Sequence, residues 1–179
     1  MRSKINFRSL RLCLQLKIYT QIFMQIKHLL STAIAIVLVQ TGWLIQTQAA
    51  EKTIVNNSFA VKQLLGKHKV NLQWLSSDNW EEFGDLKVVD RQGTLYIKGR
   101  QIKGDDYLEI EGEVLKVEAR EFTFQGSIVT RVSHMNKGKS CERYGKMVFK
   151  ITEKRKYWRL QEMQSPCDTA TDYVDIFMR

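Results

Sequence analysis

Apolar and polar side chains alternate along most of the chain after residue 69. Val70, Leu72 and Trp74 alternate with Asn71 and Gln73. This period of two places successive side chains on opposite faces of a strand and predicts a half-buried strand. The same pattern, bounded by turn residues such as Gly93 and Gly104, predicts further strands at 86–90, 95–97, 107–119, 122–132, 146–152, 156–161 and 174–176.

The long strand predicted at 107–119 changes phase in its middle. Its apolar positions are even at Leu108, Ile110 and Val114 and become odd at Leu115 and Val117. One extra residue moves all later side chains to the opposite face, so this change predicts a β-bulge or a sheet corner.

These elements predict a mainly all-β fold, an antiparallel meander of about seven or eight strands closed as a small barrel or folded as a sandwich. One short N-terminal helix precedes them. Ser58 is its predicted cap, and Ala60, Val61, Leu64 and Leu65 fall on one face before Gly66 ends it.

The first 50 residues are typical of a leader that contains a signal peptide. Lys27 and His28 precede the apolar run 29–39, and small residues at Ala49 and Ala50 provide a cleavage site. A start at Met24 gives a signal peptide of ordinary length, and residues 51–179 then form a single exported domain, periplasmic or extracellular. The alternative is an uncleaved leader that anchors the chain in a membrane, although the run is shorter than the roughly 20 apolar residues that a spanning helix needs.

The positive charge of the chain is concentrated in this leader. The whole chain carries +9, and six of its 28 basic residues precede residue 51, where there is no acidic residue. The remaining 22 basic residues face 19 acidic ones, a net charge of +3. We therefore expect no nucleic acid as a partner.

Two cysteines, Cys141 and Cys167, flank the predicted strand pair 146–152 and 156–161. An even pair in an exported chain favours a disulfide, which would close a loop of about 27 residues and stabilise the fold by roughly 3–4 kcal/mol. The alternative is a zinc site formed by His134, Cys141, Cys167 and Asp168, but this spacing matches no compact zinc pattern.

Ser133 and His134 are the candidates for a nucleophile and its base, with Asp168, Asp172 or Asp175 to orient the histidine. Adjacent side chains on a strand point to opposite faces, which separates the hydroxyl from the imidazole. Asp105, Asp106 and Glu109 suggest calcium, but turn chemistry explains them better. We predict no catalytic residue, no metal and no cofactor, and keep as the alternative a hydrolase that uses Ser133 and His134 or scattered acidic residues.

Charged residues on the outward faces form two groups. Glu109, Glu111 and Glu113 make an acidic stripe, and Arg155, Lys156 and Arg159 surround Tyr157. Opposite groups on neighbouring strands would pair with each other. The other interpretation is a basic and aromatic binding surface for an anionic envelope component, formed by Arg131, Arg143, Arg155, Lys156, Tyr157 and Arg159.

Aromatic residues at inward positions either form the core or line a cavity for a small apolar ligand. They are Trp74, Phe122, Phe124, Phe149 and Trp158. Taken together, the sequence predicts an exported module that works by binding or by structural association in the cell envelope, with its ligand unknown.

Overall fold

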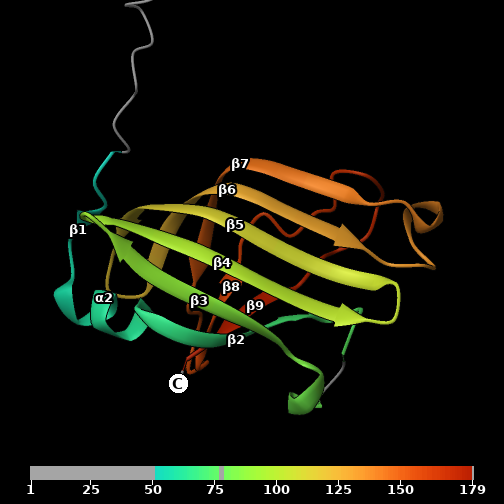
Figure 1. Ribbon diagram of the computed structural model, residues 1–179, viewed down its shortest axis with the longest axis horizontal. Helices are drawn as coiled ribbons and strands as arrows, with labels where there is room; N and C mark the ends of the chain where they lie inside the picture. Colours follow the sequence, from blue (N-terminus) through green and yellow to red (C-terminus); the bar gives the residue numbers. More distant parts are fainter. Residues whose placement is uncertain (1–50, 77–78, 179) are drawn as a thin grey trace, which may run out of the picture. The chain divides into compact units, whose positions relative to one another are not determined.

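The computed structural model describes residues 51–76 and 79–178, which form one compact unit. The described residues form nine strands, one α-helix and two short 3-10 helices (Figure 1). In chain order these are β1 (Ile54–Val55), α2 (Ser58–Leu64), β2 (Gly66–Leu72), η1 (Trp80–Glu82), β3 (Gly84–Arg91), β4 (Thr94–Lys103), β5 (Asp106–Val117), β6 (Glu121–Arg131), η2 (Asn136–Gly138), β7 (Cys141–Lys150), β8 (Tyr157–Leu160) and β9 (Val174–Phe177). The predicted signal peptide, with its start at Met24 and its cleavage site at Ala49 or Ala50, lies outside the described residues.

Strands β2 to β9 form a closed antiparallel barrel. Each strand pairs with the next one along the chain, and β9 returns to pair with β2. The predicted all-β meander is confirmed. Of the two predicted architectures, barrel and sandwich, the structure is the barrel, with eight strands. The ninth strand, β1, adds to β5 in parallel. It lies in the segment 51–57, which carries no strand pattern of its own.

The predicted β-bulge is present in β5. The register between β5 and β6 shifts between Val114 and Lys116, so that Leu115 is the extra residue. Beyond this point β1 occupies the side of β5 that β4 has left, and the hydroxyl of Thr53 donates to the carbonyl of Val114 at 2.6 Å. The bulge thus coincides with the point at which β1 replaces β4 as the neighbour of β5.

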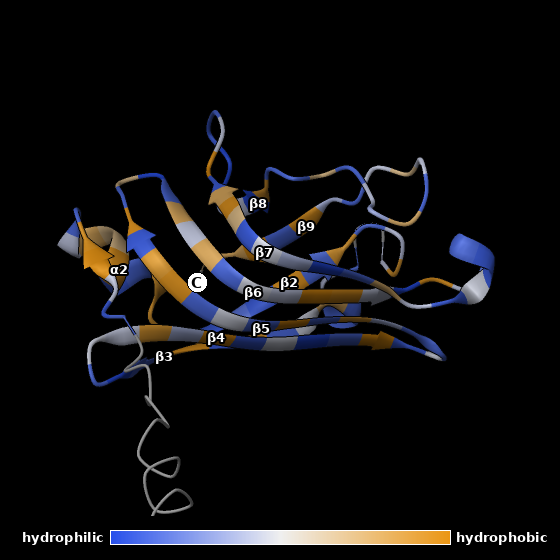
Figure 2. Ribbon diagram, turned by 90° about the horizontal axis from the view of Figure 1, so that it is seen from above, coloured by the Kyte–Doolittle hydropathy of each residue, from blue (hydrophilic) through white to orange (hydrophobic). Residues whose placement is uncertain are grey.

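Apolar and polar residues alternate along the strands (Figure 2). The buried apolar residues of the strands form one hydrophobic core cluster inside the barrel. Phe122, Phe124, Phe149 and Trp158 are each 0–3% exposed. The ring centroids of Phe122 and Phe149 lie 5.1 Å apart, and those of Phe124 and Phe149 lie 6.1 Å apart. The aromatic residues that we considered as a cavity lining are thus in direct contact with one another.

Trp74, the fifth of these predicted inward residues, does not belong to the core. The chain leaves β2 after Leu72, whose carbonyl accepts the amide of Leu75 at 2.9 Å and so forms a turn. Trp74 is 39% exposed as a result. The alternation of apolar and polar residues in the sequence runs to Trp74, two residues beyond the end of β2 at Leu72.

Helix α2 lies at one end of the barrel and buries Ala60 and Leu64 (Figures 1 and 2). Its N-cap is Asn57, whose side chain accepts the amide of Ala60 at 2.8 Å, and not the predicted Ser58. Both residue types cap helices, so the sequence places the helix correctly and misses its cap by one residue. In the part of the chain that the structure describes, no helix has the length and apolarity needed to span a membrane.

At the other end of the barrel, β3 begins only at Gly84, and a side chain from β4 fills the gap between β2 and β4. Gln101, 1% exposed, accepts the amide of Leu72 at 2.8 Å and donates to the side chain of Asn71 at 2.8 Å. These bonds continue the sheet where a strand is missing, because a buried amide without a partner would cost free energy.

A pair of opposed glycines leaves space for an aromatic ring inside the barrel. Gly112 of β5 is opposite Gly126 of β6. A Cβ at Gly126 would lie 2.6 Å from the ring of Phe124 and 2.3 Å from the carbonyl oxygen of Glu111. The glycines therefore provide the space that the ring occupies.

We predict that Gly126→Ala destabilises the protein by about 2 kcal/mol, because the added methyl group overpacks a filled core. Urea unfolding measures this change. Ser127→Ala, one residue along on the outer face, is the control and should change stability by less than about 0.5 kcal/mol. Equal stability of Gly126→Ala and the wild type would contradict the packing argument.

Candidate functional site

Four aromatic rings form a row on the outside of the barrel, next to the seam between β2 and β9. Tyr157 and Phe177 point outward because their neighbours Trp158 and Ile176 lie in the core. The ring of Phe177 lies 5.1 Å from Tyr157, 5.0 Å from Phe83 and 5.5 Å from Trp80. Trp80 is 51% exposed at the end of this row. We call Trp80, Phe83, Tyr157 and Phe177 the aromatic row.

Basic residues accompany the row on its β8 side. The guanidinium groups of Arg155 and Arg159 lie 5.7 Å and 5.2 Å from the ring centre of Tyr157. Arg159 also forms a bidentate pair with the buried Asp175, at 2.7 and 2.6 Å, and this bonding raises the pKa of Arg159. Arg155 and the exposed Lys156 have no ion pair among the described residues, so their charge faces solvent.

The structure therefore brings together only part of the predicted basic and aromatic surface. Arg155, Lys156, Tyr157 and Arg159 belong to one segment, but Arg131 and Arg143 lie elsewhere. Arg131, at the end of β6, donates to the carbonyl of Gly138 at 3.0 Å. Arg143 is buried inside the barrel end, because the period of two that turns Met147 and Phe149 inward turns Arg143 inward as well.

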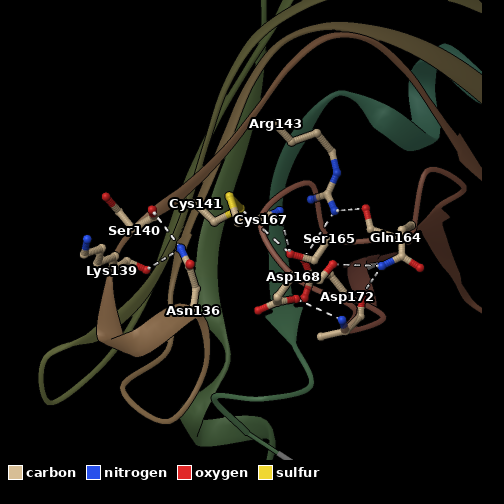
Figure 3. The surroundings of a disulfide bond; sticks show 11 residues. Asn136, Lys139, Ser140, Cys141, Arg143, Gln164, Ser165, Cys167, Asp168 and Asp172 are labelled. Carbon is tan, nitrogen blue, oxygen red and sulfur yellow. Dashed lines mark hydrogen bonds and ion pairs between the residues drawn. A yellow bond between two sulfur atoms is a disulfide. The ribbon is translucent and has the colours of Figure 1, made fainter.

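Arg143 belongs to a polar network beside the disulfide (Figure 3). Its guanidinium pairs with the carboxylate of Asp172 at 3.2 Å and donates to the carbonyl of Gln164 at 2.9 Å. The indole of Trp74 donates to the same carboxylate at 3.2 Å. Cys141, at the start of β7, forms the predicted disulfide with Cys167, and the two Cα atoms lie 5.9 Å apart. This network ties the connection between β8 and β9 to the barrel.

The residues considered for catalysis and for metal binding have other partners. The hydroxyl of Ser133 donates to Asp106, and the ring of His134 lies edge-on to Trp74 at 6.3 Å. Cys141 and Cys167 are joined to each other, so the predicted zinc alternative lacks both of its thiolates in this structure. Of the calcium candidates, Asp105 lies in the turn before β5, its carbonyl accepts Arg131, and Glu109 pairs with Arg100 at 2.9 Å.

The acidic stripe of β5 pairs with β4 and not with the basic residues of β8. Glu109 meets Arg100, and Glu111 meets Lys98 at 2.9 Å. The hydroxyl of Tyr96, which donates to Glu111, and then the Lys98 ammonium lower the pKa of the Glu111 carboxyl below its ordinary 4.5. Sequence alone does not identify β4 as this partner, because strand neighbours depend on the topology.

Sequence reasoning missed three of the four residues of the aromatic row. Trp80 and Phe83 lie in the segment between β2 and β3, which has no strand period. Phe177 alternates with the core residue Ile176, and this alternation is the one local signal of its outward direction.

A family model matches residues 52–178, which include the whole barrel and the aromatic row. The chain belongs to the PM1083 family. A relative in Pasteurella multocida (strain Pm70), "Uncharacterized protein PM1083", is 45% identical over 115 residues, which cover 64% of this chain and 73% of that protein. No solved structure matches the chain.

We predict that Arg143→Met destabilises this PM1083-family barrel by about 3 kcal/mol, because it leaves the buried Asp172 carboxylate without its cation. Urea unfolding measures the loss. Lys146→Met, which removes an exposed cation from the same strand, is the matched control and should cost less than about 0.5 kcal/mol. Similar small losses for both variants would show that the buried pair contributes nothing.

The Glu111 carboxyl predicts a dependence of stability on pH. Since its pKa is lowered in the folded protein, Glu111 stabilises the fold above pH 4.5, and this contribution is lost as the pH falls through the folded-state pKa. We expect Glu111→Gln to lower the Tm at neutral pH and to match the wild type in strong acid. Glu113→Gln, on the same stripe but without an ion pair in the described residues, should show no such difference. A Tm difference for Glu111→Gln that persists unchanged in strong acid would exclude the ionised carboxylate as its source.

Proposed function

We propose that the protein is an exported binding module of the cell envelope that attaches to an anionic membrane surface through the aromatic row and the neighbouring cations. The observation that carries this proposal is the half-exposed Trp80, which packs against Phe83 and Phe177. At the Tyr157 end of the same row lie Arg155 and Lys156, which have no acidic partner among the described residues. The Trp80 ring is held in place and still open to solvent, which are the conditions for binding with little loss of side-chain freedom.

The composition of this surface favours a lipid interface over an apolar ligand inside the barrel. Tryptophan and tyrosine prefer the region of the lipid headgroups because one part of each ring is apolar and another is polar. Nearby basic residues are attracted to anionic lipids, at about 1 kcal/mol for each Lys or Arg close to the surface. The interior, in contrast, is occupied by aromatic rings in mutual contact.

Two observations support the exported location in this proposal. The leader has the charge and apolar pattern of a signal peptide. The disulfide between Cys141 and Cys167 fits an oxidising compartment, where such bonds persist. Arg155 and Lys156 lie on the outside of the barrel. Residues 51–179, which follow the leader, carry a net charge of only +3.

We predict that the protein co-sediments with vesicles of phosphatidylglycerol and phosphatidylcholine, and that Trp80→Ala weakens this binding about tenfold, the equivalent of about 1.4 kcal/mol. Lys156→Glu should weaken it at least as much, because it exchanges an attractive charge for a repulsive one. High salt should weaken binding of the wild type, because exposed charges are screened.

The matched controls lie on β7, outside the aromatic row. Tyr144→Ala removes an aromatic side chain that is 77% exposed, and Lys146→Glu reverses an exposed charge. Both should bind vesicles within about twofold of the wild type, since neither touches the row. Equal binding to vesicles of phosphatidylcholine alone, or equal losses in the controls, would refute the proposal.

A further inference from the structure

Three lysines lie side by side on the outer face of β2, β3 and β4. Lys67 is directly opposite Lys87, and Lys87 is directly opposite Lys98. Their side chains point outward, because the neighbouring residues His68, Leu86 and Ile97 are buried. We call Lys67, Lys87 and Lys98 the lysine row.

The lysine row is an exception to the charge pairing on this face. Lys69 pairs with Asp85 and Arg100 with Glu109, each at 2.9 Å. In the lysine row only Lys98 has an acidic partner, Glu111, at 2.9 Å. Lys67 and Lys87 have no ion pair among the described residues. Like charges directly opposite each other destabilise a sheet, so this arrangement lowers the stability of the free protein.

Two shallow hollows border the row. The first, of about 390 Å³, is lined by Lys67, Asp85, Leu86, Lys87 and Lys98. The second, of about 400 Å³, shares Asp85 and Lys98 with it and extends across β4 to β5. Each volume lies in the range of sites for small molecules. The first hollow carries three ammonium groups and one carboxylate, and that carboxylate is already paired with Lys69.

We infer that the lysine row binds a phosphate group, as inorganic phosphate or as a phosphate monoester. A compact anion with more than one negative charge can accept hydrogen bonds from several ammonium groups at once, and lysine suits it as a point charge with three donors. A single carboxylate would compensate one lysine and leave the others opposed. A phosphate group can therefore compensate the positive charges of the lysines that the strand register places side by side.

This inference rests on the proposed function and deepens it, because the lysine row continues the surface of the aromatic row. Lys67 lies two residues before Lys69 on the same face of β2, and Lys69 is opposite Phe177. A phosphate in the headgroup region would then be held by the lysine row while Trp80 enters the interface.

The test uses Lys87→Glu, because the inference and a purely structural role predict different results for it. A carboxylate at position 87 faces a lysine on each side, so the variant should have a higher Tm than the wild type. It should also lose at least tenfold in affinity for inorganic phosphate and glycerol 1-phosphate, measured by amide chemical shifts during titration. In the wild type the saturable shifts should centre on Lys67, Lys87 and Lys98.

Lys146→Glu, on β7, is the matched control and should keep the phosphate affinity of the wild type within about twofold. Lys67→Gln is a second variant that removes one cation without adding a carboxylate, and it should also weaken binding. The inference is overturned if neither phosphate compound gives saturable shifts at the lysine row, or if Lys87→Glu binds phosphate as the wild type does.

Vesicle-binding measurements distinguish a failure of this inference from a failure of the proposed function. Phosphate binding at the lysine row without any vesicle binding would support the inference for a soluble phosphate ester and refute attachment to a membrane. Vesicles that displace phosphate from the row would identify the lipid headgroup as the source. Vesicle binding that depends on Trp80 but is unchanged in Lys87→Glu would exclude the lipid headgroup as the phosphate held by the lysine row and leave the proposed function standing.

Discussion

Closure of the sheet between β2 and β9 is the constraint on which the other features depend. Since every strand of the barrel then has two neighbours, the direction of each side chain is fixed by its position along the strand. The closed ladder turns Phe122, Phe124 and Phe149 inward and turns Tyr157 and Phe177 of the aromatic row outward. Where the ladder is interrupted, polar side chains continue it, as Gln101 does beside Gly84 and Thr53 does at the bulge. Because apolar side chains fill the interior, the protein meets solvent on the outer surface of the barrel.

Charge on that outer surface is arranged by strand neighbours and not by clusters along the chain. The acidic stripe of β5 is compensated by β4, and the basic segment at β8 is compensated in part by Asp175 of β9. What remains uncompensated is therefore informative, since pairing is the rule on the rest of the face. Arg155 and Lys156 beside the aromatic row, and Lys67 with Lys87 nearby, are positions at which the described residues provide no acidic partner.

The sequence predicts the elements of this fold far better than it predicts its surface. Strand periods identify the barrel strands and the bulge near Leu115, because they depend on local alternation. The disulfide follows from an even pair of cysteines. Trp74 is misplaced because alternation says nothing of where hydrogen bonding ends. Arg143 is misplaced because the predicted strand begins at Lys146, whereas β7 begins at Cys141 and its alternation turns Arg143 inward. The aromatic row and the lysine row join strands that are distant in sequence, so they depend on register, which no local pattern specifies.

The position of the disulfide has a consequence for the kinetics of folding. The seam that closes the barrel brings together His68 and Phe177, which are 109 residues apart. Contacts between such distant residues form slowly, because the chain must lose much of its entropy before they contribute. The link from Cys141 to Cys167 holds the connection before β9 against the start of β7, and so shortens the stretch of chain that must still be ordered. Oxidation thus limits the time for which two unpaired sheet edges stay open to association with other chains.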